Sequence, residues 1–196
     1  FLYKEAQLTA LRYQLNPHFL FNSLNSIQTL VYQNPKIADK MITSWSDFLR
    51  YNLNYLEKLE ISLIEEINII KQYLSIEKIR FEERLEYDIN VSDKTKKIRI
   101  PTFIIQPFIE NAIKHGMKTN PNGIKIEIIA FLNNNSLIIE INNTGEWIPE
   151  IANTGIGIKN VKERLKNTYP EKYLLKIDNI NGWIKVLIKI DSIRES

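Results

Sequence analysis

The 196-residue sequence predicts an α+β protein in which a helical hairpin precedes a sandwich of helices on one face of a mixed sheet. Two features of the chain support this. The first 80 residues contain no glycine, and their apolar residues recur three and four positions apart, as in helices. Beyond them, apolar and polar residues alternate as in half-buried strands, and two further helical stretches interrupt those strands.

The composition excludes several classes of protein and several kinds of chemistry. With 25% charged and 44% hydrophobic residues, the chain is not of the disordered, collagenous or disulfide-scaffold class. A dispersed net charge of +3 predicts no nucleic-acid partner, and no cysteine is present for thiol catalysis or a thiolate metal site. No apolar run approaches the roughly 20 residues of a membrane-spanning helix. Because the sequence opens at Phe1 rather than methionine, we expect a fragment whose sensor or membrane part lies upstream.

The first predicted helix follows an apolar pattern from Leu8 to Val31. Pro17 interrupts it, and a proline inside a helix costs about 3 kcal/mol, so a kink or break is expected there. The stripe expected to be buried contains Leu20, Leu24, Ile27 and Val31.

A second helix is predicted to start at Pro35, with Asn34 as its N-cap. The short connection makes the two helices an antiparallel hairpin. A hairpin of this length cannot cover its own apolar stripes, so we predict a homodimer in which two copies form a four-helix bundle. The second stripe contains Ile37, Ala38, Met41, Ile42, Trp45, Phe48 and Leu49.

Short sequence motifs mark the start of the third helix and a turn in the sheet. Ser62-x-x-Glu65 is a capping box that opens a helix expected to run to about Phe81, and Asn181-Gly182 predicts a hairpin turn. The domain boundary is expected between Asn54 and Ser62, giving domains 1–58 and 59–196. Strands are predicted at 85–91, 124–128, 137–141, 173–177 and 183–190, and helices at 102–115 and 157–168.

The first candidate for chemistry is His18, in the segment Asn16-Pro17-His18-Phe19-Leu20-Phe21-Asn22. At 100° per residue it lies roughly 120–180° from the predicted stripe, so its imidazole is expected to face solvent. An imidazole with a pKa near 6.5 is largely neutral at pH 7 and can attack an electrophile. The alternative is a surface histidine without chemistry.

The second candidate is the segment Pro107-Phe108-Ile109-Glu110-Asn111-Ala112-Ile113-Lys114-His115-Gly116. On a helix, Asn111, Lys114 and His115 are neighbours at i, i+3 and i+4. An asparagine oxygen suits Mg²⁺, which binds through few protein ligands plus substrate phosphates, and a lysine can meet those phosphates. The alternative is an amphipathic helix with a polar face that ends at Gly116.

The third candidate is a pair of glycine sites. Asn143-Thr144-Gly145 follows a strand, and Thr154-Gly155-Ile156-Gly157 opens a helix. Backbone N–H groups at a helix N-terminus bind anionic phosphate, although Gly-x-Gly is also common in turns.

These three segments, in this order, resemble the cytoplasmic part of LytS-type (YehU-like) sensor histidine kinases, over about Arg12 to Ile190. The segments 47–51 and 73–81 are similar to that family as well. The resemblance implies a dimerisation and phosphoacceptor hairpin followed by a Bergerat-type (GHKL) ATP-binding domain. It implies that His18 is the phosphoacceptor and that Asn111 is a Mg²⁺ ligand, with Lys114 and His115 on the phosphate side. It also implies that Asn143 and Gly145 belong to the first glycine box, and that Gly155 and Gly157 belong to the second, at the end of the ATP lid.

Two positions depart from the patterns of such kinases. The family usually has aspartate where Asn143 stands, and an uncharged acceptor for the adenine amino group is weaker by about 1 kcal/mol. Phe19 follows His18 where many histidine kinases have an acid, so the general base must come from elsewhere. We expect Glu110 to be that base, because a carboxylate before the asparagine polarises a nucleophile in the wider superfamily; the alternative is a cap or salt bridge.

The expected function is ATP-dependent autophosphorylation on His18, followed by transfer to an aspartate of a response regulator, which the resemblance suggests is of the LytTR type. ATP and Mg²⁺ are the expected cofactors. The chain is expected to be the cytoplasmic domain of a bacterial membrane sensor. Two alternatives remain: a GHKL ATPase or serine kinase that does not use His18, and a nucleotide-poor dimeric docking scaffold, which Asn143 would favour.

Overall fold

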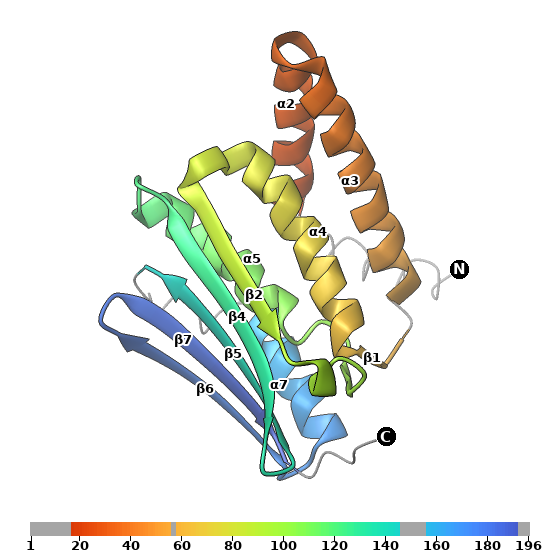
Figure 1. Ribbon diagram of the computed structural model, residues 1–196, viewed down its shortest axis with the longest axis vertical. Coiled ribbons are helices and arrows are strands. Elements are labelled where there is room, and N and C mark those ends of the chain that lie inside the picture. The colour runs from red at the N-terminus through yellow and green to blue at the C-terminus, as the bar shows by residue number, and fades with distance from the viewer. Residues whose placement is uncertain (1–16, 56–57, 146–155, 192–196) are drawn as a thin grey trace.

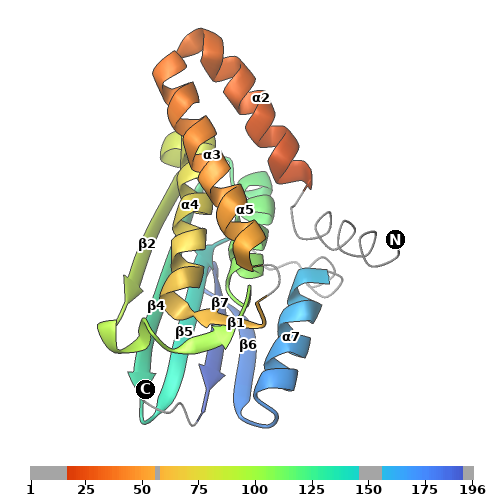
Figure 2. The same cartoon turned by 90° about the vertical axis from the view of Figure 1, so that its right-hand side faces the viewer.

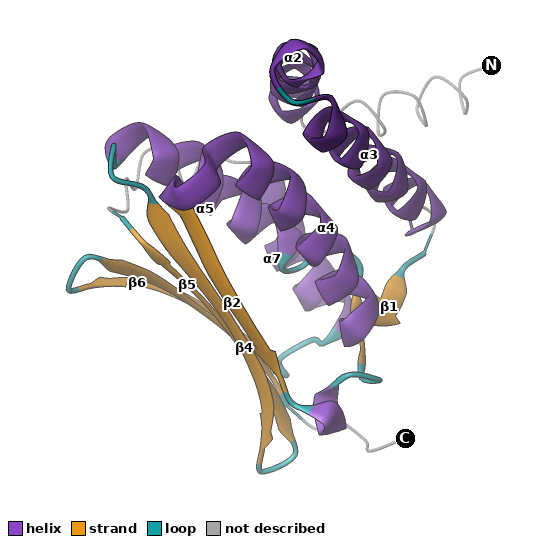
Figure 3. Ribbon diagram, turned by 45° about the horizontal axis from the view of Figure 1, so that its top comes forward, coloured by secondary structure: helices purple, strands orange, loops and turns teal. Residues whose placement is uncertain are grey.

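The computed structural model describes residues 17–55, 58–145 and 156–191 and confirms the α+β fold. A helical hairpin stands beside a sandwich in which three helices cover one face of a five-stranded sheet (Figures 1 and 3). No helix in the described ranges is long and apolar enough to cross a membrane. The helices are α2 (Pro17–Gln33), α3 (Pro35–Tyr55), α4 (Leu63–Phe81), α5 (Gln106–Thr119) and α7 (Ile156–Thr168). The strands are β1 (Glu60–Ser62), β2 (Leu85–Val91), β3 (Arg99–Pro101), β4 (Ile124–Asn133), β5 (Ser136–Thr144), β6 (Tyr173–Ile180) and β7 (Trp183–Ile190).

The main sheet has the strand order β2-β4-β5-β7-β6. β2 pairs parallel with β4, and the remaining neighbours pair antiparallel, so the sheet is mixed as predicted. The alternation along β4 buries Ile124, Ile126 and Ile128 under the helices. α4 contacts β2, α5 contacts β4 and β5, and α7 contacts β6 (Figure 2). The Asn181-Gly182 turn between β6 and β7 is confirmed by positive φ angles of 54° and 76°.

The hairpin forms where the sequence indicates a stop and a start. Asn34 caps α3, since its Oδ1 accepts a hydrogen bond from the Ile37 N–H at 3.3 Å. Proline occupies the first position of α2 and of α3, where its missing N–H is not needed. The part of the expected first helix before Pro17 lies outside the described residues.

The expected buried stripe of α2 is wrong at two positions. Leu24 and Val31 are 47% and 48% exposed, whereas Phe19 and Ser23 are buried. The reason is that α2 packs through the neighbouring face onto α3 and α4. There the Phe19 ring lies 5.4 Å from that of Phe48 and 4.8 Å from that of Tyr73, centroid to centroid.

The fourth described helix, α5, is shifted from the predicted range 102–115. It begins later, at Gln106, with Pro107 in its first turn, and it continues to Thr119. Gly116 therefore lies inside the helix and does not end it. A Cβ there would lie 2.7 Å from Ile124 Cγ2, so the glycine permits close packing of α5 on β4.

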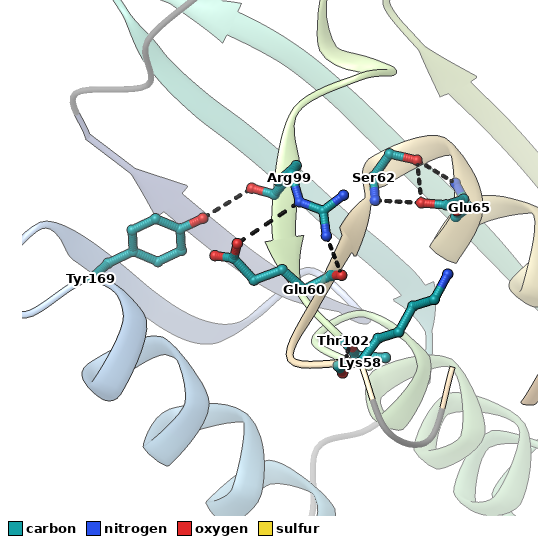
Figure 4. Close-up of polar contacts among 7 residues, drawn as sticks. All are labelled: Lys58, Glu60, Ser62, Glu65, Arg99, Thr102 and Tyr169. Atoms are coloured by element: carbon teal, nitrogen blue, oxygen red, sulfur yellow. Dashed lines mark hydrogen bonds and ion pairs between the residues drawn. The ribbon is translucent and has the colours of Figure 1, made fainter. Parts of the chain in front are cut away.

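The capping box of α4 is confirmed. Ser62 Oγ accepts from the Glu65 N–H at 3.4 Å, and Glu65 Oε2 accepts from the Ser62 N–H at 2.7 Å (Figure 4). Together with Tyr55, whose hydroxyl donates to Glu65 Oε1 at 3.1 Å, this cap connects the end of α3 to the start of α4.

A small two-stranded sheet, β1 with β3, was not predicted, and it connects the hairpin to the sandwich. Arg99 donates to the Glu60 carbonyl at 2.6 Å, and the Tyr169 hydroxyl donates to the Arg99 carbonyl at 3.0 Å (Figure 4). Thr102 Oγ1 donates to the Lys58 carbonyl at 2.6 Å. These bonds fix the chain that follows α3 against the segment leading into α5.

Candidate functional site

Helix α5 carries four of the predicted site residues. Asn111, Lys114 and His115 lie one helical turn apart, as the spacing predicts; Lys114 is exposed, and the other two are partly buried. Burial lowers the pKa of His115, and the nearby charges of Lys114 and Lys118 lower it further. The His115 imidazole is therefore neutral at neutral pH and can donate or accept a hydrogen bond beside the lysine.

The N-terminus of α5 is held by a residue that sequence reasoning missed. Glu66 of α4 is fully buried, and its Oε1 accepts from the N–H groups of Ile105 and Gln106 at 2.6 and 3.2 Å. Burial raises the pKa of Glu66 to about 7, although these backbone hydrogen bonds and the Arg164 charge oppose the rise. Arg164 of α7 also donates to the Thr102 carbonyl. The sequence feature that could have indicated this role is a glutamate among the apolar positions of the third predicted helix.

We expect the Glu66→Gln variant to unfold with a weaker dependence on pH than the wild type. Since the Glu66 pKa is raised from 4.5 to about 7 by folding, the folded state keeps a proton that the unfolded chain releases. The stabilisation is complete below pH 4.5 and is lost as pH rises through about 7, by at most about 3.5 kcal/mol at roughly 1.4 kcal/mol per pKa unit. Glutamine keeps the acceptor but does not titrate.

Urea unfolding at pH 5 and pH 8 measures this difference. The loss of stability between the two pH values should be smaller in Glu66→Gln than in the wild type, whereas Glu163→Gln, an exposed change on α7, should behave as wild type. An identical loss in all three proteins would contradict the protonated state of Glu66.

Glu110 is positioned by its own helix. Gln106 Nε2 donates to Glu110 Oε1 at 2.7 Å. Burial raises the pKa of Glu110 to about 7, and this hydrogen bond and the Lys114 charge act in the opposite direction. A carboxyl group that titrates near neutral pH can take up a proton, as general base catalysis requires.

Glu110 faces a cavity between the hairpin and the sandwich. The cavity has a volume of about 170 Å³ and is lined by residues of three helices. α2 contributes Phe19, α5 contributes Glu110 and Lys114 among others, and α4 forms the remaining wall. The residue after His18 and the residue before Asn111 therefore line one space.

The glycine sites have roles in the backbone. Gly145, at the end of β5, has a φ of 138° that disfavours any side chain, and its N–H donates to the Gly182 carbonyl at 3.0 Å. Asn143 is buried, and its Nδ2 donates to the Thr144 carbonyl at 3.1 Å. Gly157 lies in the first turn of α7, where a Cβ would come within 3.2 Å of Pro107 Cβ. It thus allows α7 to approach α5.

The structure leaves two predicted features undescribed, one a side chain and the other a segment. His18 is the second residue of α2, but its side chain, and hence its expected exposure, is not described. Gly155 and the expected lid, up to Asn153, fall in the undescribed range 146–155.

The donor set fits a magnesium–nucleotide complex. Asn111 offers an amide oxygen, and Lys114 beside it offers a positive charge. Among the residues that the structure describes, no group of three or more histidine, aspartate or glutamate residues could hold a metal alone. Mg²⁺ that is bound mainly by phosphates and water does not need such a group.

Comparison with known proteins shows consistent similarities. The family model described as "Histidine kinase" matches residues 6–85. Sensor histidine kinase YesM of Bacillus subtilis is 35% identical over 180 residues, covering 89% of this chain and 31% of the relative. Sensor protein LytS of Staphylococcus haemolyticus is 31% identical over 191 residues, covering 91% and 33%. The chain thus spans about a third of the length of these relatives.

A solved structure agrees with the fold. The histidine kinase domain of the blue-light activated histidine kinase from Erythrobacter litoralis EL346 matches with a TM-score of 0.53 at 13% identity. The match covers 89% of this chain and 95% of that one, so the hairpin and the sandwich occur together in both.

Proposed function

We propose, since this chain belongs to the sensor histidine kinase family, that it transfers the γ-phosphoryl group of ATP to His18 and then to an aspartate of a response regulator. One observation carries the proposal. Phe19, next to His18 in the sequence, lines the same cavity as Glu110 and Lys114, which flank Asn111. The phosphoacceptor segment is therefore docked beside the helix proposed to bind the nucleotide.

The hairpin and the sandwich are assigned separate roles in this proposal. Residues 1–58 form the dimerisation and phosphotransfer hairpin, and residues 59–196 form the ATP-binding domain. Homodimerisation is supported by large apolar side chains that the single chain leaves exposed on the hairpin, which a second copy would cover. A regulator of the LytTR type and an upstream membrane sensor, with this part in the cytoplasm, complete the proposal. The exposed side chains of the hairpin are Phe21, Leu24, Val31, Tyr32, Ile37, Ile42, Tyr51 and Leu53.

In the proposed reaction, the residues of α5 position and neutralise the phosphates. Asn111 would hold Mg²⁺, which when bound screens the phosphate charge, and Lys114 would add a positive charge. A ring nitrogen of His18 forms a bond to the γ-phosphorus as the bond to the bridging oxygen breaks and ADP leaves. Glu110 accepts the proton released by the other ring nitrogen. The phosphoryl group then passes from the imidazole to a carboxylate oxygen of the regulator.

Incubation with γ-labelled ATP and Mg²⁺ tests the proposal. The wild type should acquire label that is labile in acid and stable in base, and His18→Gln should acquire none while still binding a fluorescent ATP analogue. Label that persists in His18→Gln, or ATP turnover unaffected by it, would favour an ATPase or serine kinase. Failure of the wild type to bind nucleotide would favour the docking scaffold, since Asn143 replaces the usual aspartate.

A further inference from the structure

Helix α4 supplies a wall of the cavity that the reaction above does not use. Tyr73, Glu77, Arg80 and Phe81 line it, and all four belong to the segment 73–81. They recur at i, i+4, i+7 and i+8, so they lie on one face of α4. Three segments that are distant in the sequence therefore line the cavity: the segment 73–81, the segment after His18, and the segment around Asn111.

Arg80 is held firmly at this wall. Its Nη1 lies 2.6 Å from Glu77 Oε2, and its guanidinium carbon lies 4.7 Å from the centre of the Phe81 ring. The side chains of Arg80 and Glu77 are only 14% and 2% exposed. A guanidinium has five N–H donors in a fixed plane, and the bond to Glu77 uses one of them.

The charges around the cavity favour an anion. Arg80, Lys114 and Lys118 contribute positive charges, and Glu77 and Glu110 are the acidic residues. Burial raises the pKa of each glutamate to about 7, with Arg80 opposing the rise at Glu77 and Gln106 opposing it at Glu110. Near neutral pH the two carboxyl groups together carry less than their full negative charge, so the three cations predominate.

We propose that Arg80 is a further catalytic residue of the phosphoryl transfer: its guanidinium binds the oxygens of the phosphoryl group that moves between ATP and His18, and Glu77 positions it. The inference rests on the proposed kinase function. An arginine suits this role because its planar fork matches two phosphate oxygens, which a lysine ammonium does not. The competing explanation is that Arg80 serves only to neutralise the buried Glu77.

The test compares initial labelling rates over a range of ATP concentrations in the full chain. Arg80→Gln should lower kcat by about 100-fold or more, as loss of one donor to a transition state does, and change KM for ATP only severalfold. Arg80→Lys keeps the charge beside Glu77 and should remain at least about tenfold slow, since the fork is lost. Arg84→Gln is the matched control, because Arg84 lies 6.0 Å from the same Phe81 ring and does not line the cavity.

The double variant Glu77→Gln/Arg80→Gln separates the two explanations. If Arg80 binds the phosphoryl group, the double variant stays as slow as Arg80→Gln. If Arg80 only neutralises Glu77, removal of both charges restores the wild-type rate and overturns the inference, as would a wild-type rate in Arg80→Lys. A wild type that takes no label, or label that survives His18→Gln, would refute the kinase function instead.

Discussion

Asn111→Asp should reduce the labelling of His18 at least about 100-fold, while the protein retains its fold and its dimeric mass. The aspartate has nearly the shape of asparagine, but it loses the N–H donors and places a negative charge where the phosphates of the nucleotide are proposed to lie. Lys114, the neighbouring cation, would then be shared between the new carboxylate and the phosphates. Scintillation counting of the acid-labile label, with light scattering for the mass, measures both results.

Asn122→Asp provides the matched control for this variant. Asn122 is exposed in the turn after α5, and its N–H donates to Asn120 Oδ1 at 3.2 Å, away from the proposed site. The same change of charge there should leave the labelling rate within about twofold of wild type, as exposed charges interact weakly. Retention of full labelling in Asn111→Asp would refute the role of Asn111.

The elements that could be predicted from the sequence are those specified by neighbouring residues. Ser62 with Glu65, and Asn34 with Pro35, mark helix starts through contacts within four residues, and Asn181-Gly182 sets a turn by itself. The five strands of the main sheet follow from runs of five or more residues rich in apolar side chains, which alternate with polar ones most clearly in β2 and β4.

The features that could not be predicted depend on distant partners. Strands β1 and β3 have three residues each, too few to show a period, and they exist because each pairs with the other. Glu66 looks like one polar residue on a helix until the N-terminus of α5 lies against it. The start of α5 at Gln106 depends on that same contact.

The candidate site likewise has a part that the sequence predicts and a part that it does not. The neighbours Asn111, Lys114 and His115 could be placed together from their spacing alone, since one helix fixes them. That Phe19 and Arg80 line the same cavity as Glu110 could not, because helices α2 and α4 come together only in the folded chain. The sequence likewise did not indicate which face of α2 contacts α4, and so Leu24 was expected to be buried although it is exposed.

Glu110→Gln should slow labelling by about 100-fold or more and alter its dependence on pH. A general base acts only when deprotonated. Because burial raises the pKa of Glu110 to about 7, the wild-type rate should increase as pH rises through about 7 and level off above it. Glutamine keeps an oxygen that can accept the hydrogen bond from Gln106, so the variant loses the titrating group and little of the local packing.

The neighbouring charged groups affect the dependence of the labelling rate on pH. Glu77, Arg80 and Lys114 share the cavity with Glu110, and Glu110 itself contributes to the raised pKa of Glu77, so the two carboxyl groups titrate as a coupled pair. Repulsion between the two carboxylates should therefore spread the rise of the wild-type rate over a wider pH range, and Glu110→Gln should show a smaller rise with a lower plateau.

Glu83→Gln is the control for loss of a carboxylate, because the Glu83 side chain is 99% exposed and pairs loosely with Lys78 at 3.8 Å. Its rate and pH profile should match the wild type, since screening by water makes such a pair worth little. If Glu110→Gln and Glu83→Gln gave the same profile, the proton of His18 would have to leave through another group. Glu77 would then be the remaining carboxyl group on the cavity wall, and Glu77→Gln in the same assay would identify it.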